Sequence, residues 1–148
     1  MPEVSFYILP SCSQQERFLF ACRLIEKAYQ KKQFCYVQTN NHQQSQQLDN
    51  QLWSFKPSSF IPHKILQDTL PEFEQSILIG TQAAPEKWKK IVMNLSSNYP
   101  EDANQMERIL EVLDNNAETK QVARVRYKQY QQAGINITIH NMRTQHNS

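Results

Sequence analysis

Apolar residues in the first part of the chain fall in two alternating patterns, short continuous runs and helical spacing. The run at 4–9, ended by Pro10, predicts a strand. Ser13 and Glu16 stand in the spacing of a capping box, which predicts the start of a helix. That helix places its apolar side chains on one face: Phe18, Ala21, Cys22, Ile25, Ala28 and Tyr29. The run at 34–37 predicts a second strand, so the three elements form a predicted βαβ unit with parallel pairing.

The alternation continues to the end of the chain. A glutamine-rich segment capped by Asn41 predicts a helix over 41–53. Further apolar runs predict strands at 76–80, 90–95 and 135–139. The segment 107–113 fits a helix or a strand by periodicity, and the cap residues directly after it favour a strand. Together these elements predict one three-layer α/β domain over 1–140, with a mostly parallel sheet flanked by helices, and a polar, flexible tail over 141–148.

The segment 55–66 is unusually apolar for a connection between elements. Pro57 and Pro62 interrupt any regular structure there, so an irregular loop is predicted. Phe60 lies inside the loop and Trp53 lies just before it. Either the loop folds over a sheet edge and is buried, or it forms an exposed apolar patch that another protein covers.

The segment 116–134 is predicted to be a helix with two distinct faces. Asn115 and Glu118 stand in capping-box spacing, and Gly134 suits the left-handed residue after the last turn. One face is predicted to pack on the core: Val122, Val125, Gln129 and Ala133, with Tyr130 beside them. The other combines cations with one aromatic ring: Lys120, Arg124, Tyr127 and Lys128. This second face is either a solvated surface or a docking face for an acidic ligand with a hydrophobic end.

Composition narrows the class of protein. The 148 residues carry a net charge of +2, which gives no overall basic field for binding nucleic acid. No apolar run approaches the length of a bilayer span and no secretion signal begins the chain, so we expect a cytoplasmic protein without membrane contact. Three cysteines without a Cys-x-x-Cys pair predict free thiols. Cys22 and Cys35 stand in apolar patterns and are predicted to be buried, whereas Cys12 lies outside such a pattern.

The sequence contains no convincing active site. Its two glycines, Gly80 and Gly134, form no phosphate-binding motif, so the expected fold is Rossmann-like without a phosphate-binding loop. Its four histidines have no metal-ligand spacing, and we expect neither a metal nor a cofactor. Cys12, at a strand-to-helix turn, resembles a nucleophile without an identifiable base, and His63 is interpreted as a structural loop residue.

Five short segments, spread over nearly the whole chain, match one known family in order and in letters. They are Phe6-Tyr-Ile-Leu9, Leu52-Trp53, Ser59-Phe-Ile-Pro-His63, Lys120-Gln-Val-Ala-Arg-Val-Arg-Tyr-Lys-Gln-Tyr130 and Ala133-Gly-Ile-Asn136. Together they resemble the chi subunit of bacterial DNA polymerase III. The fourth segment is the most specific, whereas 67–107 matches in pattern more than in letters.

The resemblance implies a non-catalytic accessory subunit of the clamp-loader assembly in DNA replication. Its implied partners are the psi subunit, which tethers it to the clamp loader, and the acidic, hydrophobic C-terminal tail of single-stranded-DNA-binding protein. An iron–sulfur helicase that competes for the psi site is a further implied partner, and no direct contact with DNA is required.

The resemblance also assigns residues to each partner. For tail binding they are Lys120, Arg124 and Tyr127, with Leu113 at the apolar pocket and Lys128 and Arg126 as neighbours. For psi binding they are Trp53 and Phe60. Leu113 is larger than the valine usual in the family, which leaves the depth of the pocket open. The alternatives are a direct single-stranded nucleic-acid binder that uses the cationic helix face, an accessory partner of a repair helicase, or an enzyme built on Cys12 or His63.

Overall fold

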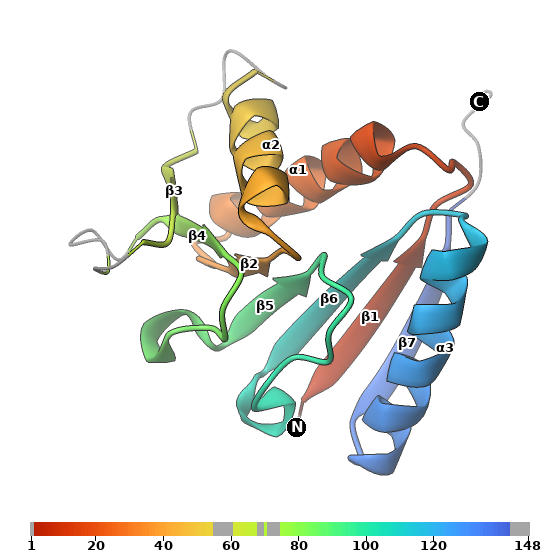
Figure 1. Cartoon of the computed structure of the whole chain (residues 1–148). Helices are drawn as coiled ribbons and strands as arrows, with labels where there is room; N and C mark the ends of the chain where they lie inside the picture. The colour runs from red at the N-terminus through yellow and green to blue at the C-terminus, as the bar shows by residue number, and fades with distance from the viewer. Residues whose placement is uncertain (1, 55–60, 68–69, 71–74, 143–148) are drawn as a thin grey trace.

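A single parallel sheet of seven strands organises the computed structural model, which describes residues 2–54, 61–67, 70 and 75–142. The strands follow the order β3-β4-β2-β5-β6-β1-β7, and every neighbouring pair is parallel (Figure 1). They are β1 (Glu3–Ile8), β2 (Tyr36–Gln38), β3 (His63–Ile65), β4 (Ile77–Gly80), β5 (Ile91–Asn94), β6 (Arg108–Leu113) and β7 (Asn136–Asn141). The strand predicted at 107–113 is therefore confirmed.

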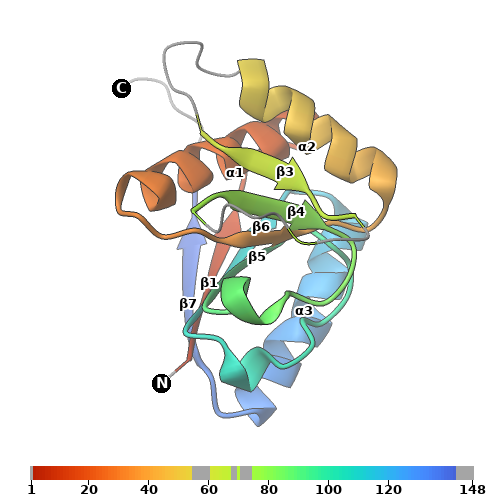
Figure 2. The same cartoon turned by 90° about the vertical axis from the view of Figure 1, so that its left-hand side faces the viewer.

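Helices cover both faces of the sheet, which confirms the predicted three-layer α/β fold. The two helices α1 (Gln14–Gln30) and α2 (His42–Ser54) lie on one face and α3 (Ala117–Gln132) lies on the other (Figures 1 and 2). Two short 3-10 helices, η1 (Glu86–Trp88) and η2 (Ala103–Gln105), complete the layer that contains α3. Within the described ranges, no helix combines the length and the apolar character that a bilayer span requires.

The ends of the helices follow the cap signals, with one exception. Ser13 Oγ accepts the Glu16 N–H at 3.2 Å, and Asn41 Oδ1 accepts the Gln44 N–H at 2.9 Å, so both predicted caps are confirmed. Gly134, with φ of 76°, has the predicted left-handed backbone.

The exception is the start of α3, where the predicted cap Asn115 is wrong by one residue. Asn116 is the N-cap and makes no side-chain cap bond. The Asn115 N–H instead donates to the Ser11 carbonyl at 2.8 Å, and the Asn116 N–H donates to the Asp114 carboxylate at 3.0 Å. Because these bonds fix the turn before the helix, α3 starts one residue later.

Two predictions about the strands are corrected. β1 and β2 are parallel members of one sheet, but they are not paired, because β5 and β6 lie between them. The segment 61–66 is not wholly irregular, since β3 forms directly after Pro62 and pairs with β4. A proline just before a strand interrupts no ladder bond, and the Pro62 carbonyl still accepts the Ile77 N–H at 2.9 Å. Residues 55–60 of the predicted loop lie outside the described part.

The end of the chain continues the sheet beyond residue 140. β7 extends to Asn141, and Met142 donates its N–H to the Ile8 carbonyl at 2.9 Å. The Met142 side chain packs against the cluster beneath α1. The remainder of the predicted tail, 143–148, lies outside the described residues.

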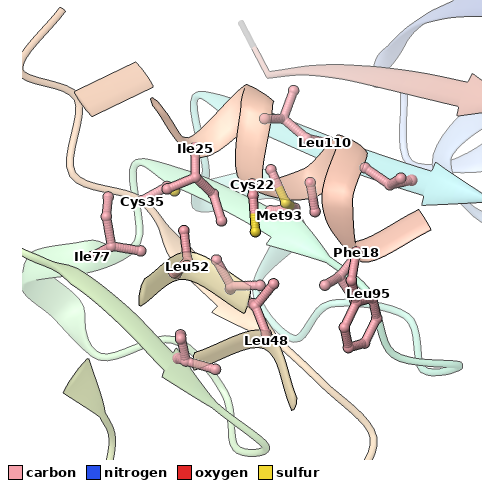
Figure 3. Close-up of a cluster of buried hydrophobic side chains, with 14 of the residues drawn as sticks. Phe18, Cys22, Ile25, Cys35, Leu48, Leu52, Ile77, Met93, Leu95 and Leu110 are labelled. Atoms are coloured by element: carbon pink, nitrogen blue, oxygen red, sulfur yellow. The ribbon is translucent and has the colours of Figure 1, made fainter. Parts of the chain in front are cut away.

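The core between the sheet and the pair α1 and α2 is almost wholly apolar (Figure 3). Phe18, Cys22 and Ile25 of α1 are fully buried there, and Leu48 of α2 meets them from the second helix. Cys35 is also fully buried, so the prediction of two buried cysteines is confirmed. Burial of this cluster in the predicted helical spacing explains why α1 and α2 lie where the sequence pattern places them.

The face of α3 that meets the sheet differs in part from the predicted one. The predicted core residue Val125 is 52% exposed, and Gln129 is also exposed. Tyr130 is 0% exposed and Ala133 packs against the core cluster, so these two predictions are confirmed. The helix also buries Arg126, which is 2% exposed and was not predicted to face the core. The Tyr130 ring packs edge-on against Phe6 of β1, with the ring centroids 5.9 Å apart.

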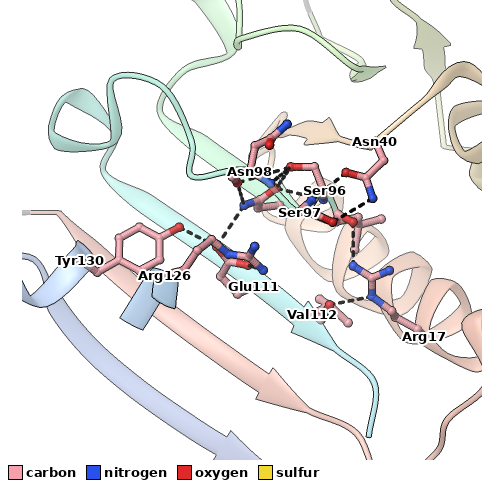
Figure 4. A network of polar contacts seen from close by, with 11 residues as sticks. Arg17, Asn40, Ser96, Ser97, Asn98, Glu111, Val112, Arg126 and Tyr130 are labelled. Atoms are coloured by element: carbon pink, nitrogen blue, oxygen red, sulfur yellow. Dashed lines mark hydrogen bonds and ion pairs between the residues drawn. The ribbon is translucent and has the colours of Figure 1, made fainter. Parts of the chain in front are cut away.

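A buried carboxylate on β6 accounts for this rotation of α3 (Figure 4). Glu111 is fully buried and points toward α3. Its carboxylate accepts Arg126 Nε at 3.0 Å and the Tyr130 hydroxyl at 2.6 Å, and it lies 2.9 Å from Arg126 Nη2. Asn94 Nδ2 on β5 adds a bond of 3.1 Å. Burial raises the pKa of the Glu111 carboxyl, and the Arg126 guanidinium opposes that rise.

The Glu111–Arg126 pair predicts a large effect of removing only the cation. Arg126→Met should lower the free energy of unfolding by about 3–5 kcal/mol, because it leaves a buried carboxylate without its counter-charge. The exposed Arg124 provides the control, and Arg124→Ala should change that free energy by no more than about 0.5 kcal/mol. Urea unfolding followed by circular dichroism measures both. Equal effects of the two substitutions would contradict the proposed importance of the buried pair.

The three thiols should differ sharply in reactivity. Burial raises the pKa values of the Cys22 and Cys35 thiols to about 12, whereas Cys12 is exposed. Because the thiolate is the reactive form, a disulfide reagent at pH 8 should modify one thiol in the native protein and all three after denaturation. Cys12→Ser should remove the native reaction entirely, and rapid native modification of that variant would contradict the burial of the other two.

Candidate functional site

A pocket of about 710 Å³ lies beside α3. Its lining residues come from α3, from the carboxyl ends of β1 and β6 and from the edge strand β7, and Figure 1 shows the arrangement of these elements. Five of the six residues predicted for the tail-binding site line the pocket: Leu113, Lys120, Arg124, Tyr127 and Lys128. Six apolar lining residues come from β1, β7 and the segments after them: Phe6, Ile8, Leu9, Pro10, Ile139 and Met142. The structure thus brings the predicted residues together, while their binding role stays a prediction.

The sheet and the helix fix the apolar part of this pocket. Leu113 is the last residue of β6, pairs with Ile8 of β1 and is 2% exposed. The Tyr127 ring lies against Phe6, with the ring centroids 6.1 Å apart. Tyr127 is half-buried, so one part of its ring is packed on the sheet and the other lines the pocket. An apolar group that enters the pocket would therefore meet surfaces that are already ordered.

The cations of the pocket form no ion pair among the residues that the structure describes. Lys120, Arg124 and Lys128 are exposed and form no ion pair with any described residue. They stand four residues apart on one helix, a spacing at which like charges repel one another by about 0.2–0.5 kcal/mol per pair. A carboxylate also lines the pocket, that of Asp114, and it accepts the Asn116 N–H. The positive charge at this site therefore exceeds the negative charge, and an anionic ligand would relieve the repulsion.

One neighbouring cation does not belong to the pocket. Arg126 was grouped with the tail-binding residues from the sequence, but its guanidinium is buried against Glu111 and does not line the pocket. Sequence reasoning also missed the lining residues Phe6, Ile8 and Ile139. They lie on strands that become neighbours only in the folded sheet, so no local pattern indicates them.

The second predicted patch lies on the other helix layer. Trp53, in the last turn of α2, is 55% exposed, and its ring lies 4.7 Å from the ring of His63. His63 Nδ1 lies 2.7 Å from the Ile61 carbonyl and Nε2 lies 3.2 Å from the Asp49 carboxylate. These contacts hold His63 beside Trp53. Phe60, the other residue predicted for this patch, lies outside the described residues.

The sequence model of the family described as "DNA polymerase III chi subunit, HolC" matches residues 1–138. The chain belongs to the DNA polymerase III chi subunit family. It is 28% identical to the DNA polymerase III subunit chi of Pseudomonas aeruginosa over 142 residues, and this alignment covers 96% of this chain and 98% of the relative. The corresponding subunit of Escherichia coli is 21% identical over 141 residues, with 93% of this chain and 96% of the relative covered.

Family membership has direct consequences for this chi-family chain. It is a protein of DNA replication and associates with the replication machinery, and the accessory nature of the chi subunit indicates a non-catalytic role. The Cys12 thiol lies 3.8 Å from the Asn115 carbonyl oxygen, which cannot serve as a base. Among the described residues, no cluster of three or more histidine, cysteine or acidic side chains could hold a metal ion.

Arg17 occupies the place where open parallel sheets commonly bind ligands, the carboxyl end of the strands. In this chi-family chain its Nε donates to the Val112 carbonyl at 2.8 Å and its Nη2 donates to the Leu95 carbonyl at 2.7 Å (Figure 4). It lines a polar crevice of about 300 Å³ together with hydroxyl and amide side chains such as Ser96 and Asn40. The guanidinium thus joins α1 to the ends of β5 and β6. A side chain of the protein itself therefore lies where a ligand binds in many such sheets.

Proposed function

We propose that the pocket beside α3 binds the acidic C-terminal tail of single-stranded-DNA-binding protein. The observation that supports this most is the combination of three cations that pair with no described residue, Lys120, Arg124 and Lys128, with an apolar pocket closed by Tyr127 and Leu113. A tail that ends in a phenylalanine and carries aspartates matches both parts. Its ring would enter the apolar pocket, and its carboxylates would meet the cations at the rim.

The expected affinity is moderate. Burial of an aromatic side chain contributes about 1.5–3 kcal/mol. An exposed ion pair adds about 0.2–1 kcal/mol and a well-formed charged hydrogen bond about 1.5–3 kcal/mol. After the costs of association, a dissociation constant near the micromolar range, about −8 kcal/mol, is expected. Several tails on one coated DNA strand would raise the effective concentration and hold the assembly more firmly than a single tail does.

We further propose that the patch around Trp53 binds the psi subunit of the clamp loader. A large aromatic side chain that is 55% exposed at the end of α2 offers apolar area that a partner can bury. Phe60, seven positions after Trp53 in the sequence, is proposed to contribute to the same surface. An iron–sulfur helicase that uses this surface instead of psi is the alternative partner for it. In both cases the chain would link two proteins through surfaces on opposite faces of the sheet (Figures 1 and 2).

Arg124→Ala should weaken tail binding by about tenfold to a hundredfold, because a hydrogen bond to a charged group contributes about 1.5–3 kcal/mol. Calorimetric titration with a short acidic peptide ending in Asp-Ile-Pro-Phe measures this, and binding to the unaltered chain should weaken as salt rises. Arg23→Ala is the matched control, because Arg23 is an exposed arginine on α1, in the other helix layer, and lies outside this pocket.

Two outcomes of that titration would contradict the proposal. If the unaltered chain does not bind the peptide, the cationic face of α3 is only a solvated surface. If a labelled oligo-dT strand binds at moderate salt and Arg124→Ala abolishes that binding, the face belongs to a direct single-stranded nucleic-acid binder.

Trp53→Ala should abolish co-purification with psi. Truncation of a central aromatic residue at an interface commonly costs about 2 kcal/mol of binding free energy or more, which is the usual threshold for a hot spot. Trp53→Phe should retain part of the binding, and Phe60→Ala should behave like Trp53→Ala. Tail binding by the same variants should stay unchanged. If Trp53→Ala and Arg124→Ala each weakened both interactions equally while the chain stayed folded, the model of two separate sites would be wrong.

A further inference from the structure

Two exposed aliphatic side chains lie at the same pocket. In the described ranges, the exposed large hydrophobic residues are Trp53, Leu70, Val125 and Ile139. Val125 is 52% exposed, Ile139 is 48% exposed, and both line the pocket beside α3. We call this pair of residues the aliphatic rim. Exposed apolar residues that gather at one pocket are typical of a ligand-binding surface.

The two residues reach the pocket from different elements. Val125 follows Arg124 on α3, and Lys128 lies one helical turn after Val125. Ile139 is on β7, paired in register with Phe6 of β1, so the two side chains share the sheet face that meets α3. The aliphatic rim therefore connects the cations of α3 with the apolar floor of the pocket.

Neither folding nor local preference explains Val125. Valine is a weaker helix former than alanine or the long polar residues, and half of its side chain remains in water here. The buried positions of the helix near it are Arg126 and Tyr130. A valine that is left out of the core and placed next to the cations fits a contact with a ligand.

The volume of the pocket points in the same direction. The pocket volume of about 710 Å³ lies in the range of about 300–1,000 Å³ that accommodates drug-sized ligands. This volume is larger than one aromatic side chain occupies. A single terminal ring against Tyr127 and Leu113 would leave the aliphatic rim exposed. A ligand with a second apolar side chain would cover it.

We infer that the aliphatic rim binds an aliphatic side chain of the acidic tail, two positions before its terminal aromatic residue. Val125 and Ile139 would then determine which tails the pocket binds. This assignment rests on the proposed tail-binding function. The cations would bind any acidic C-terminus, whereas the rim would select tails that carry two apolar residues. Acidity alone would then be insufficient for binding.

The test compares two peptides of equal charge, one ending in Asp-Ile-Pro-Phe and one ending in Asp-Ser-Pro-Phe, by calorimetric titration. The unaltered chain should bind the isoleucine peptide about tenfold more tightly, which corresponds to about 1.4 kcal/mol. In the double variant Val125→Ser with Ile139→Thr the preference should fall below about twofold, because the surface that distinguishes the peptides is gone. Val122→Ser is the matched control, since Val122 lies on the same helix but outside this pocket, and it should keep the full preference.

The outcomes separate this inference from the proposed function. If the unaltered chain binds both peptides equally, tail binding stands and the role of the aliphatic rim is wrong. If the preference persists in the double variant, another surface reads the isoleucine and the assignment to Val125 and Ile139 is wrong. If neither peptide binds, the proposed function fails and this inference fails with it. Circular dichroism of the double variant checks that it is folded, which the exposure of both residues leads us to expect.

Discussion

The arrangement of the C-terminal half depends on one buried ion pair, that between Glu111 and Arg126. A carboxylate with no exposure in the middle of a parallel sheet requires a cation and further donors, and α3 supplies both Arg126 and Tyr130. Because successive residues of a helix are about 100° apart, fixing these two positions fixes every other side chain of α3. Lys120, Arg124 and Lys128 then point to one side, at the pocket, and cannot rotate inward.

The same interaction explains why hydrophobic periodicity located α3 but misjudged its orientation. The pattern correctly predicted the helix, its glycine end signal and the cation-aromatic face. It placed Val125 in the core because it counts apolar residues, and it has no means to recognise that a buried arginine is anchored by a glutamate on another element. The strand β3 was missed for a different reason. Three residues after a proline give too short a pattern, and pairing with β4 decides their conformation.

Other features of the site depend on the order of the strands, which no local pattern contains. Phe6 and Ile139 are more than a hundred residues apart in sequence, yet they are paired neighbours in the sheet. The predicted unit of β1 and β2 is likewise split by two strands that come later in the chain. The identity of the elements was therefore predictable from the sequence, whereas the apolar half of the pocket was not. The cationic half was predictable because one helix carries it all.

The pocket cations of α3, which form no ion pair within the described part of the chain, also affect the rate of association. Like charges held on a rigid helix attract an acidic tail before contact, and such steering can raise association toward about 10⁸ M⁻¹s⁻¹ at low salt. Combined with the micromolar affinity expected for the proposed tail, this rate predicts complexes that last about ten milliseconds. A subunit of this kind would exchange one tail for the next many times each second. The subunit could thus remain bound to the tail-coated DNA strand while its contact with each individual tail is brief.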